Sequence, residues 1–261
     1  MKTLIITFIL CCTLKSYNQT NIYGTVNYVS NHKKDDYQNV HYALTFGDGF
    51  SAFLMTGQDT SQTVRTPEYD DEIIIRKKYP DSLYSKYFLD VAASRMYAVE
   101  PVSEDDFETF DLYYVAESAK LDWKIQHEFR QIDSYTCQKA LLEFRGRSYT
   151  AWFAKDVTVP YGPFKFNGLP GLILSIEDNL KEVSFKATSV KLSTKKNNAK
   201  QLFNDWVKQK EAITIESFFS IKNRAREKSS NQFRSVLLSK LPRGATVKVS
   251  NQTDVSIELK L

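Results

Sequence analysis

Hydrophobic and polar residues alternate along much of the first two thirds of the chain. In segment 121–130, one set of alternate positions is mostly apolar and the other is charged or polar. The first set is Leu121, Trp123, Ile125, His127 and Phe129, and the second includes Lys124, Gln126, Glu128 and Arg130. A period of two predicts a half-buried β-strand in this segment.

The same alternation recurs in segments that are separated by short turn sequences. These segments are 40–46, 135–144, 147–154, 172–177 and 183–192, and Gly146 and Asp178-Asn179 lie at two of the turns. Consecutive hairpins of this kind predict an antiparallel sheet that packs one face against a core.

After Ser193 the apolar spacing becomes helical. One stripe of a first helix, within 199–211, carries Leu202, Phe203, Trp206 and Val207. Thr214 is a suitable cap for a second helix with Phe218, Ile221 and Ala225, and a third short helix is expected near Phe233 before Pro242. We therefore predict an α+β fold, a mainly antiparallel curved β-sheet with C-terminal helices packed on it.

The first nineteen residues have the pattern of a secretory signal peptide. Lys2 is followed by an apolar run from Thr3 to Cys12, and 15–19 are polar. The run is too short to span a bilayer as a helix, which takes about 20 residues. We expect cleavage near residue 19 and a mature chain without a transmembrane segment, exported to the periplasm or cell envelope or secreted. The mature chain would keep only Cys137, so it could form no internal disulfide.

The remaining residues, 20–261, are predicted to form a single domain. It would be β-rich over 20–192 and helical over 197–241, with a final strand over 245–261. The chain has 261 residues and is 42% hydrophobic, which is enough for a core and excludes a disordered chain.

Charge is distributed unevenly along the chain. Residues 191–261 hold 15 Lys and Arg against 6 Asp and Glu, whereas residues 1–190 hold 20 against 25. Two interpretations stay open: solvated surfaces of opposite sign, or a basic face for an acidic partner or lipid headgroups. Nucleic acid is not an expected partner for an exported protein with this near-neutral total.

Segment 160–171 is rich in residues that restrict or relax the backbone. It contains three of the seven prolines and three of the nine glycines. Such a composition indicates a rigid, specifically folded connection. It is either a packed loop between hairpins or a preshaped wall or lip of a binding cleft, with Tyr161, Phe164 and Phe166 as aromatic anchors.

The string Gly168-Leu169-Pro170-Gly171-Leu172-Ile173 resembles the signature of the GLPGLI family, exported bacterial proteins of uncharacterised function. Further similarity lies at 123–125, 135–140, 144–147, 151–153, 162–166 and 257–259. The resemblance implies an exported envelope protein and supplies no reaction, cofactor or substrate. The order of the strands also resembles periplasmic lipoprotein carriers, which are curved half-barrels that hold acyl chains on an apolar concave face.

Candidate catalytic and metal-binding residues are few. His127 lacks a second ligand at metal-binding spacing and is interpreted as a core histidine, and no metal site or cofactor is expected. A nucleophilic Cys137–His127 pair is an alternative to Cys137 as a small buried apolar residue. The sequence has neither a G-x-S-x-G elbow nor a glycine-rich phosphate loop.

Arg145 and Arg147 flank Gly146 in a predicted tight turn. They are either exposed charges at a hairpin tip or a fork for a carboxylate or phosphate, extended by Lys165. Trp152 and Phe153 occupy opposite faces of their strand, so one is expected in the core and the other could line a cleft. The complete candidate binding set is Arg145, Arg147, Trp152, Tyr161, Phe164, Lys165, Phe166, Gly168, Leu169, Pro170 and Gly171.

These features favour a non-catalytic envelope module that binds an apolar or amphipathic ligand. The expected partner is a lipid, a peptide or an outer-membrane protein. Two alternatives stay open: an enzyme that depends on a thiol or on carboxylates, and a purely structural envelope protein.

Overall fold

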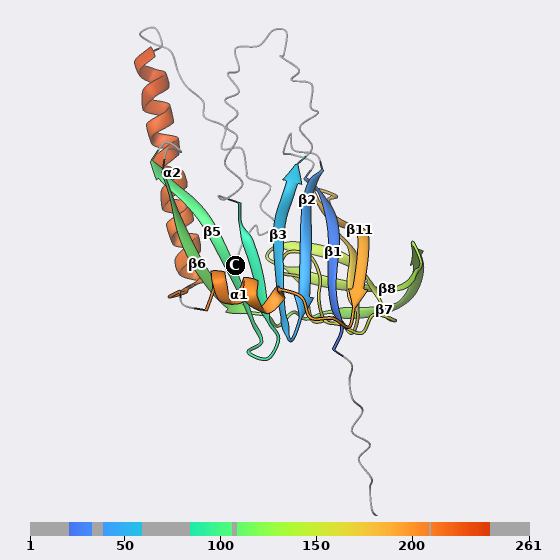
Figure 1. The fold of residues 1–261 in the computed structure, drawn as a ribbon. Helices are drawn as coiled ribbons and strands as arrows, with labels where there is room; N and C mark the ends of the chain where they lie inside the picture. Colours follow the sequence, from blue (N-terminus) through green and yellow to red (C-terminus); the bar gives the residue numbers. More distant parts are fainter. Residues whose placement is uncertain (1–20, 33–38, 59–83, 106–108, 209, 241–261) are drawn as a thin grey trace, which may run out of the picture.

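The computed structural model describes residues 21–32, 39–58, 84–105, 109–208 and 210–240. Within these residues, twelve strands join into one sheet (Figure 1). The first six are β1 (Tyr23–His32), β2 (Val40–Gly47), β3 (Phe50–Gln58), β4 (Lys86–Asp90), β5 (Arg95–Asp105) and β6 (Thr109–Ser118). The others are β7 (Lys124–Ile132), β8 (Tyr135–Phe144), β9 (Arg147–Ala154), β10 (Leu172–Asp178), β11 (Val183–Ser193) and β12 (Ile213–Thr214).

The strands are arranged in the order β12-β6-β5-β4-β3-β2-β1-β11-β10-β9-β8-β7. All neighbours are antiparallel except β12 and β6, which are parallel. The sheet therefore consists of two meanders, β1–β6 and β7–β11, joined by the pairing of β1 with β11, with the short β12 added beside β6. The predicted α+β fold, a curved and mainly antiparallel sheet with helices packed on it, is confirmed.

The sheet curls strongly although it does not close. Among the described strands, β6 and β7 follow each other in the main part of the chain, but β7 is at one end of the strand order and β6 is next to the other end, which is β12. Only residues 119–123 connect them. A connection of this length spans at most about 20 Å. The two ends of the sheet must therefore approach each other where this connection lies.

One face of the sheet, which we call the inner face, holds the largest hydrophobic cluster. It carries side chains from both meanders, including Leu44, Phe53, Ala151, Phe153 and Phe185. These residues are at most 2% exposed. The chain segment between β9 and β10 packs against them and supplies the rest of this cluster.

Helix α1 (Ala199–Trp206) covers the opposite, outer face of β3, β4 and β5. Its Phe203 ring lies 4.8 Å from Phe50, 5.5 Å from Tyr97 and 6.5 Å from Phe88 between ring centroids. Phe88 pairs with Tyr97 across β4 and β5, so both side chains are on this face.

Helix α2 (Ile215–Lys240) packs on the inner face, over β5 and β6. Its Phe218 and Ala225 join a cluster with Ala98 and Val115, which pair with each other across the two strands. Thr214 caps the helix, as predicted, because its Oγ1 accepts the backbone N–H of Ser217 at 3.2 Å. The prediction of a separate third helix is wrong, since α2 continues without a break to Lys240.

Two predictions lie outside the described residues, namely the signal peptide over 1–19 and the final strand over 245–261. Among the described residues, no helix is long and apolar enough to cross a membrane.

Candidate functional site

The proline- and glycine-rich segment 160–171 forms a loop that packs into the inner face of the sheet. Its backbone is tied to itself, because the Gly168 N–H donates to Pro160 O and the Phe166 N–H donates to Pro163 O, both at 3.0 Å. Gly168 has φ +86°, which favours glycine, and a Cβ on Gly171 would lie 2.2 Å from Ala154 O. The prediction of a rigid, specifically folded connection agrees with these contacts.

The aromatic side chains of this loop are core residues. Tyr161, Phe164, Phe166 and Leu169 are all buried, whereas Gly168 and Pro170 are exposed. Ring centroids lie 4.7 Å apart for Tyr161 and Phe46, 4.6 Å for Phe164 and Tyr87, and 4.8 Å for Phe166 and Tyr149. The loop thus contacts β2, β4 and β9 at once and fills the space that the curled sheet encloses.

The Lys165 side chain extends from this loop toward β6. Its Nζ lies 2.5 Å from Glu117 Oε1, and Nη2 of Arg145 lies 2.7 Å from Glu117 Oε2. The Lys165 and Glu117 side chains are 4% and 9% exposed. One carboxylate on β6 therefore joins the β8–β9 turn and the loop at the place where the sheet curls back.

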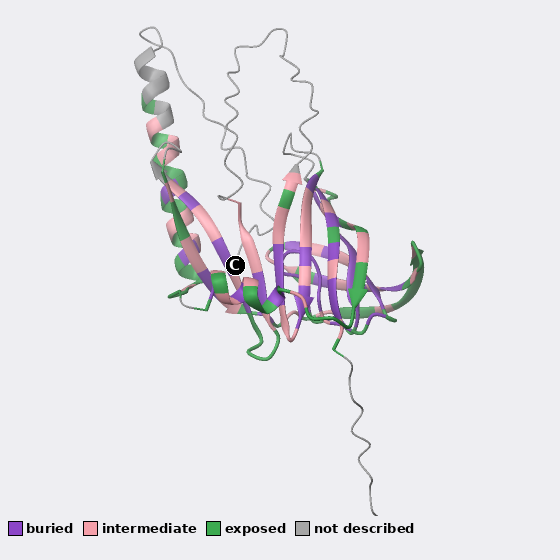
Figure 2. Cartoon of the chain, viewed as in Figure 1, coloured by how far each residue is buried: buried purple, intermediate pink, exposed green. Residues whose placement is uncertain are grey.

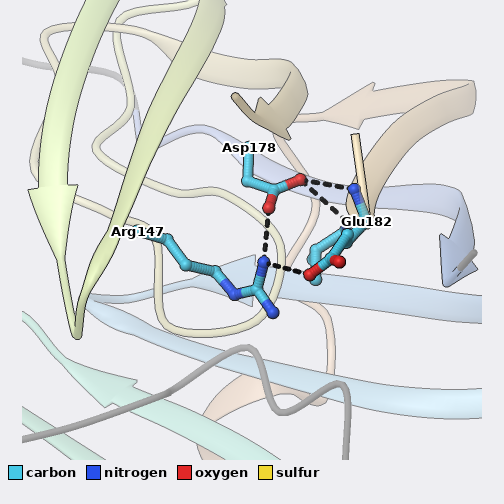
Figure 3. A network of polar contacts seen from close by, with 4 residues as sticks. Arg147, Asp178 and Glu182 are labelled. Carbon is cyan, nitrogen blue, oxygen red and sulfur yellow. Dashed lines mark hydrogen bonds and ion pairs between the residues drawn. The ribbon is translucent and has the colours of Figure 1, made fainter. Parts of the chain in front are cut away.

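Arg147 forms a separate buried network with two carboxylates (Figure 3). Its Nη1 lies 2.5 Å from Asp178 Oδ2 and 2.9 Å from Glu182 Oε2. Asp178 Oδ1 also accepts the backbone N–H groups of Glu182 and Val183. Burial lowers the pKa of the guanidinium, but the hydrogen bonds to Glu182 and Asp178 outweigh this effect and raise the pKa overall.

The structure does not assemble Arg145, Arg147 and Lys165 into one anion-binding fork. Arg147 is bound by Asp178 and Glu182, whereas the other two cations are bound by Glu117. The alternative of exposed hairpin-tip charges is also wrong for Arg147, whose side chain is buried. The physical reason is that acidic residues distant in the sequence neutralise each cation.

Trp152 and Phe153 lie on opposite faces of β9, as predicted. Phe153 is fully buried on the inner face. Trp152 is half-buried on the outer face, where the Arg130 guanidinium lies 4.2 Å from its ring centroid.

The geometry does not favour a nucleophilic role for Cys137. Its side chain is fully buried in β8, and burial raises the pKa of the thiol to about 11, so the thiol is protonated at neutral pH. His127 is exposed on β7, so its interpretation as a core histidine is wrong. Within the described part of the chain, no three His, Cys, Asp or Glu side chains are grouped as a metal site would require.

Strand β7 presents an exposed apolar surface, which the sequence analysis missed. The strand forms one edge of the sheet, and much of it is coloured as exposed in Figure 2. Its residues Ile125 and Phe129 are 46% and 51% exposed. Ile125 pairs with Ala140 and Phe129 with Gln138, so both lie on the inner face. The strand itself was predicted correctly, but its apolar side is not half-buried.

The loop contacts the beginning of this surface. Trp123, just before β7, donates its Nε1–H to Asn167 O at 2.8 Å and packs 6.4 Å from Phe166. Farther along the strand, Ile125 and Phe129 are exposed, and Lys155 Nζ lies 5.4 Å from the Phe129 ring. We call Trp123, Ile125 and Phe129 the β7 strip.

Comparison with known proteins identifies the fold but no activity. A family described as "Protein of unknown function (Porph_ging)" matches residues 143–175. No curated protein matches the chain. The structure of PNGF-II in space group P21 is similar, with a TM-score of 0.50, 14% identity and coverage of 78% of this chain. In space group C2 the TM-score is 0.49 with 14% identity over 78% of this chain.

The chain spans about a third of the length of these solved structures, 34% and 33% of the respective chains. At 14% identity, the similarity supports the curved sheet and carries no information on activity.

Proposed function

We propose that the chain is an exported, non-catalytic binding module of the cell envelope that takes a polypeptide segment along strand β7. One observation carries the proposal. The alternation of β7 is typical of a strand whose apolar side is buried, yet Ile125 and Phe129 on that side are exposed. Apolar side chains that are exposed together on one face of an edge strand favour a partner that covers them.

A polypeptide fits this surface better than an acyl chain. The loop residues Tyr161, Phe164, Phe166 and Leu169 fill the inner face, where a lipoprotein-carrier-like protein would hold a lipid. An edge strand instead offers backbone N–H and C=O groups on its free side, which an extended peptide can bind while its side chains cover the apolar ones.

The candidate reactive groups support a role in folding rather than in chemistry. Arg147, Arg145 and Lys165 hold together elements that are distant in the sequence. Export is proposed from the pattern of residues 1–19. Membership of the GLPGLI family is proposed from Gly168–Ile173, which lie within the matched segment 143–175.

Photo-crosslinking tests the proposal. A photoreactive amino acid replaces Phe129 in the full chain, expressed in its own host and irradiated in intact cells. We expect a protease-sensitive adduct, whose mass spectra place the crosslink at residue 129 and which is lost when Ile125→Asp is added. The matched control carries the same group at Leu180, an exposed apolar residue in the β10–β11 turn. Equal labelling at both positions, or a lipid adduct at position 129, would refute the proposal.

A further inference from the structure

The segment around β7 is complementary to itself when it is read in both directions from Gln126. Two positions away on either side are Lys124 and Glu128, and four positions away are Asp122 and Arg130. One position away are Ile125 and His127, and three positions away are Trp123 and Phe129. An antiparallel strand of the same sequence, centred on Gln126, would thus place opposite charges against each other and aromatic rings against each other.

We infer that the polypeptide that binds β7 is β7 of a second copy of this chain, in antiparallel pairing about a two-fold axis at Gln126. The inference rests on the proposed function and names the partner of the same surface. A two-fold interface uses one patch on both copies, so each favourable contact occurs twice.

The strand places these groups on the faces that such pairing requires. Lys124 pairs with Leu141 and Arg130 with Cys137, which puts both cations on the outer face. Ile125 and Phe129 lie on the inner face, so charged and apolar contacts are separated by the sheet. In the dimer, Lys124 would face Glu128 of the second copy on the outer side. Phe129 would pack on Trp123 of the second copy on the inner side.

Glu128 keeps room for this second contact. Its carboxylate binds Lys139 Nζ at 3.0 and 2.9 Å within the chain, but the side chain is still 59% exposed. A carboxylate accepts hydrogen bonds at both oxygens, so it can hold Lys139 and Lys124 of the second copy together.

The irregularity of β7 bears on which partner can bind. The pairing of β7 with β8 shifts register between Ile125 and Phe129. An irregular edge is a poor template for an arbitrary strand, because the backbone ladder is interrupted. A partner must therefore make up for the interrupted backbone ladder with complementary side chains, and a second copy of this segment has them. A nine-residue edge makes a small interface, so we expect a weak, concentration-dependent dimer.

Charge-reversal variants test the inference. The dimer dissociation constant of the purified chain that begins at residue 20 is measured by sedimentation equilibrium. The wild type should dimerise reversibly. Lys124→Glu should raise the dimer dissociation constant about tenfold or more, because both charge pairs become repulsive. Glu128→Lys should do the same. An equimolar mixture of the two variants should form heterodimers, since both pairs then join opposite charges again.

The matched control is Lys186→Glu, a charge reversal at an exposed lysine on β11, which should leave the dissociation constant unchanged. Circular dichroism of each variant checks that it is folded. A wild type that stays monomeric at millimolar concentration, a dimer that tolerates Lys124→Glu, or a mixture that stays monomeric would overturn the inference. If the dimer is overturned in this way but the photoreactive group at position 129 crosslinks to another polypeptide, the proposed function holds with a different partner. If it crosslinks to none, both fail.

Discussion

The ammonium group of Lys165 lies 2.5 Å from the carboxylate of Glu117, although the two residues come from the inner loop and from a strand near the far end of the sheet. Arg145 binds the other oxygen of the same carboxylate. One largely buried anion therefore holds two cations at the place where the sheet curls back.

Replacing Glu117 by Gln should destabilise the fold by about 3 kcal/mol, because two largely buried cations lose their counter-charge. Lys165→Met should cost less, about 1 kcal/mol, since Glu117 keeps Arg145. Urea unfolding followed by tryptophan fluorescence measures both. If Lys165→Met proves as damaging as Glu117→Gln, the carboxylate is not the centre of the cluster.

The Arg147 network should be more sensitive than an ion pair on the surface. Arg147→Met leaves Asp178 and Glu182 without their cation in a buried site, and we expect a loss of about 3–5 kcal/mol. Lys139→Met removes the exposed pair with Glu128 and should cost about 1 kcal/mol or less. Chemical denaturation of the two variants side by side makes the comparison, and similar losses would contradict it.

Stability should fall at alkaline pH. Burial raises the pKa of Cys137 to about 11 and that of Tyr161 to about 12, from ordinary values of 9.0 and 10.0. The unfolded chain releases these protons first, so their contribution is fully present below pH 9 and is lost as the pH rises toward 12.

The free energy of unfolding, measured in urea at pH 7, 9 and 10.5, checks this sign. Cys137→Ala should remove part of the decline between pH 9 and 11 while leaving the decline due to Tyr161. A free energy that rises over this interval would show that the two groups are not buried as described.

Two glycines should respond very differently to one added methyl group. Gly171→Ala places a Cβ 2.2 Å from Ala154 O and should cost about 2 kcal/mol through forced backbone movement. Gly57→Ala meets nothing within 4 Å and should change stability by less than about 0.5 kcal/mol. Thermal melting of both variants separates these cases, and a neutral Gly171→Ala would mean that the loop can shift away from β9.

Two phenylalanines distinguish the core from the β7 strip. Phe166→Ala removes a buried ring and should cost about 3–5 kcal/mol. Phe129→Ala removes a half-exposed ring and should cost about 1 kcal/mol or less in the monomer. Unfolding experiments at low protein concentration measure the monomer, where a large loss for Phe129→Ala would show that the ring belongs to the core.

Local pattern predicted the elements of this fold better than their surroundings. Alternation correctly located β7, because side-chain direction depends only on neighbouring residues. Its exposure was missed, since alternation shows which face is apolar but not what covers it. The partners of Arg147 lie 31 and 35 residues along the chain, and no local spacing points to them.

The helical region illustrates the same limit. A separate third helix was expected near Phe233, yet α2 continues to it through the polar residues Ser229, Ser230 and Asn231. Polar residues of this kind weaken a helix only slightly, so they do not end it as a proline would. The proline-glycine loop was easier to predict because its residues constrain the backbone directly.

The pairing of β1 with β11 has a consequence for how the molecule is made. The first of the described strands, β1, pairs with a strand far along the chain, and Tyr23 lies opposite Ser193, which is 170 residues later. β1 can pair with β2 early, but its other edge has no native partner until β11 has been synthesised. Contacts so remote in sequence slow folding, so we expect the sheet to be completed late.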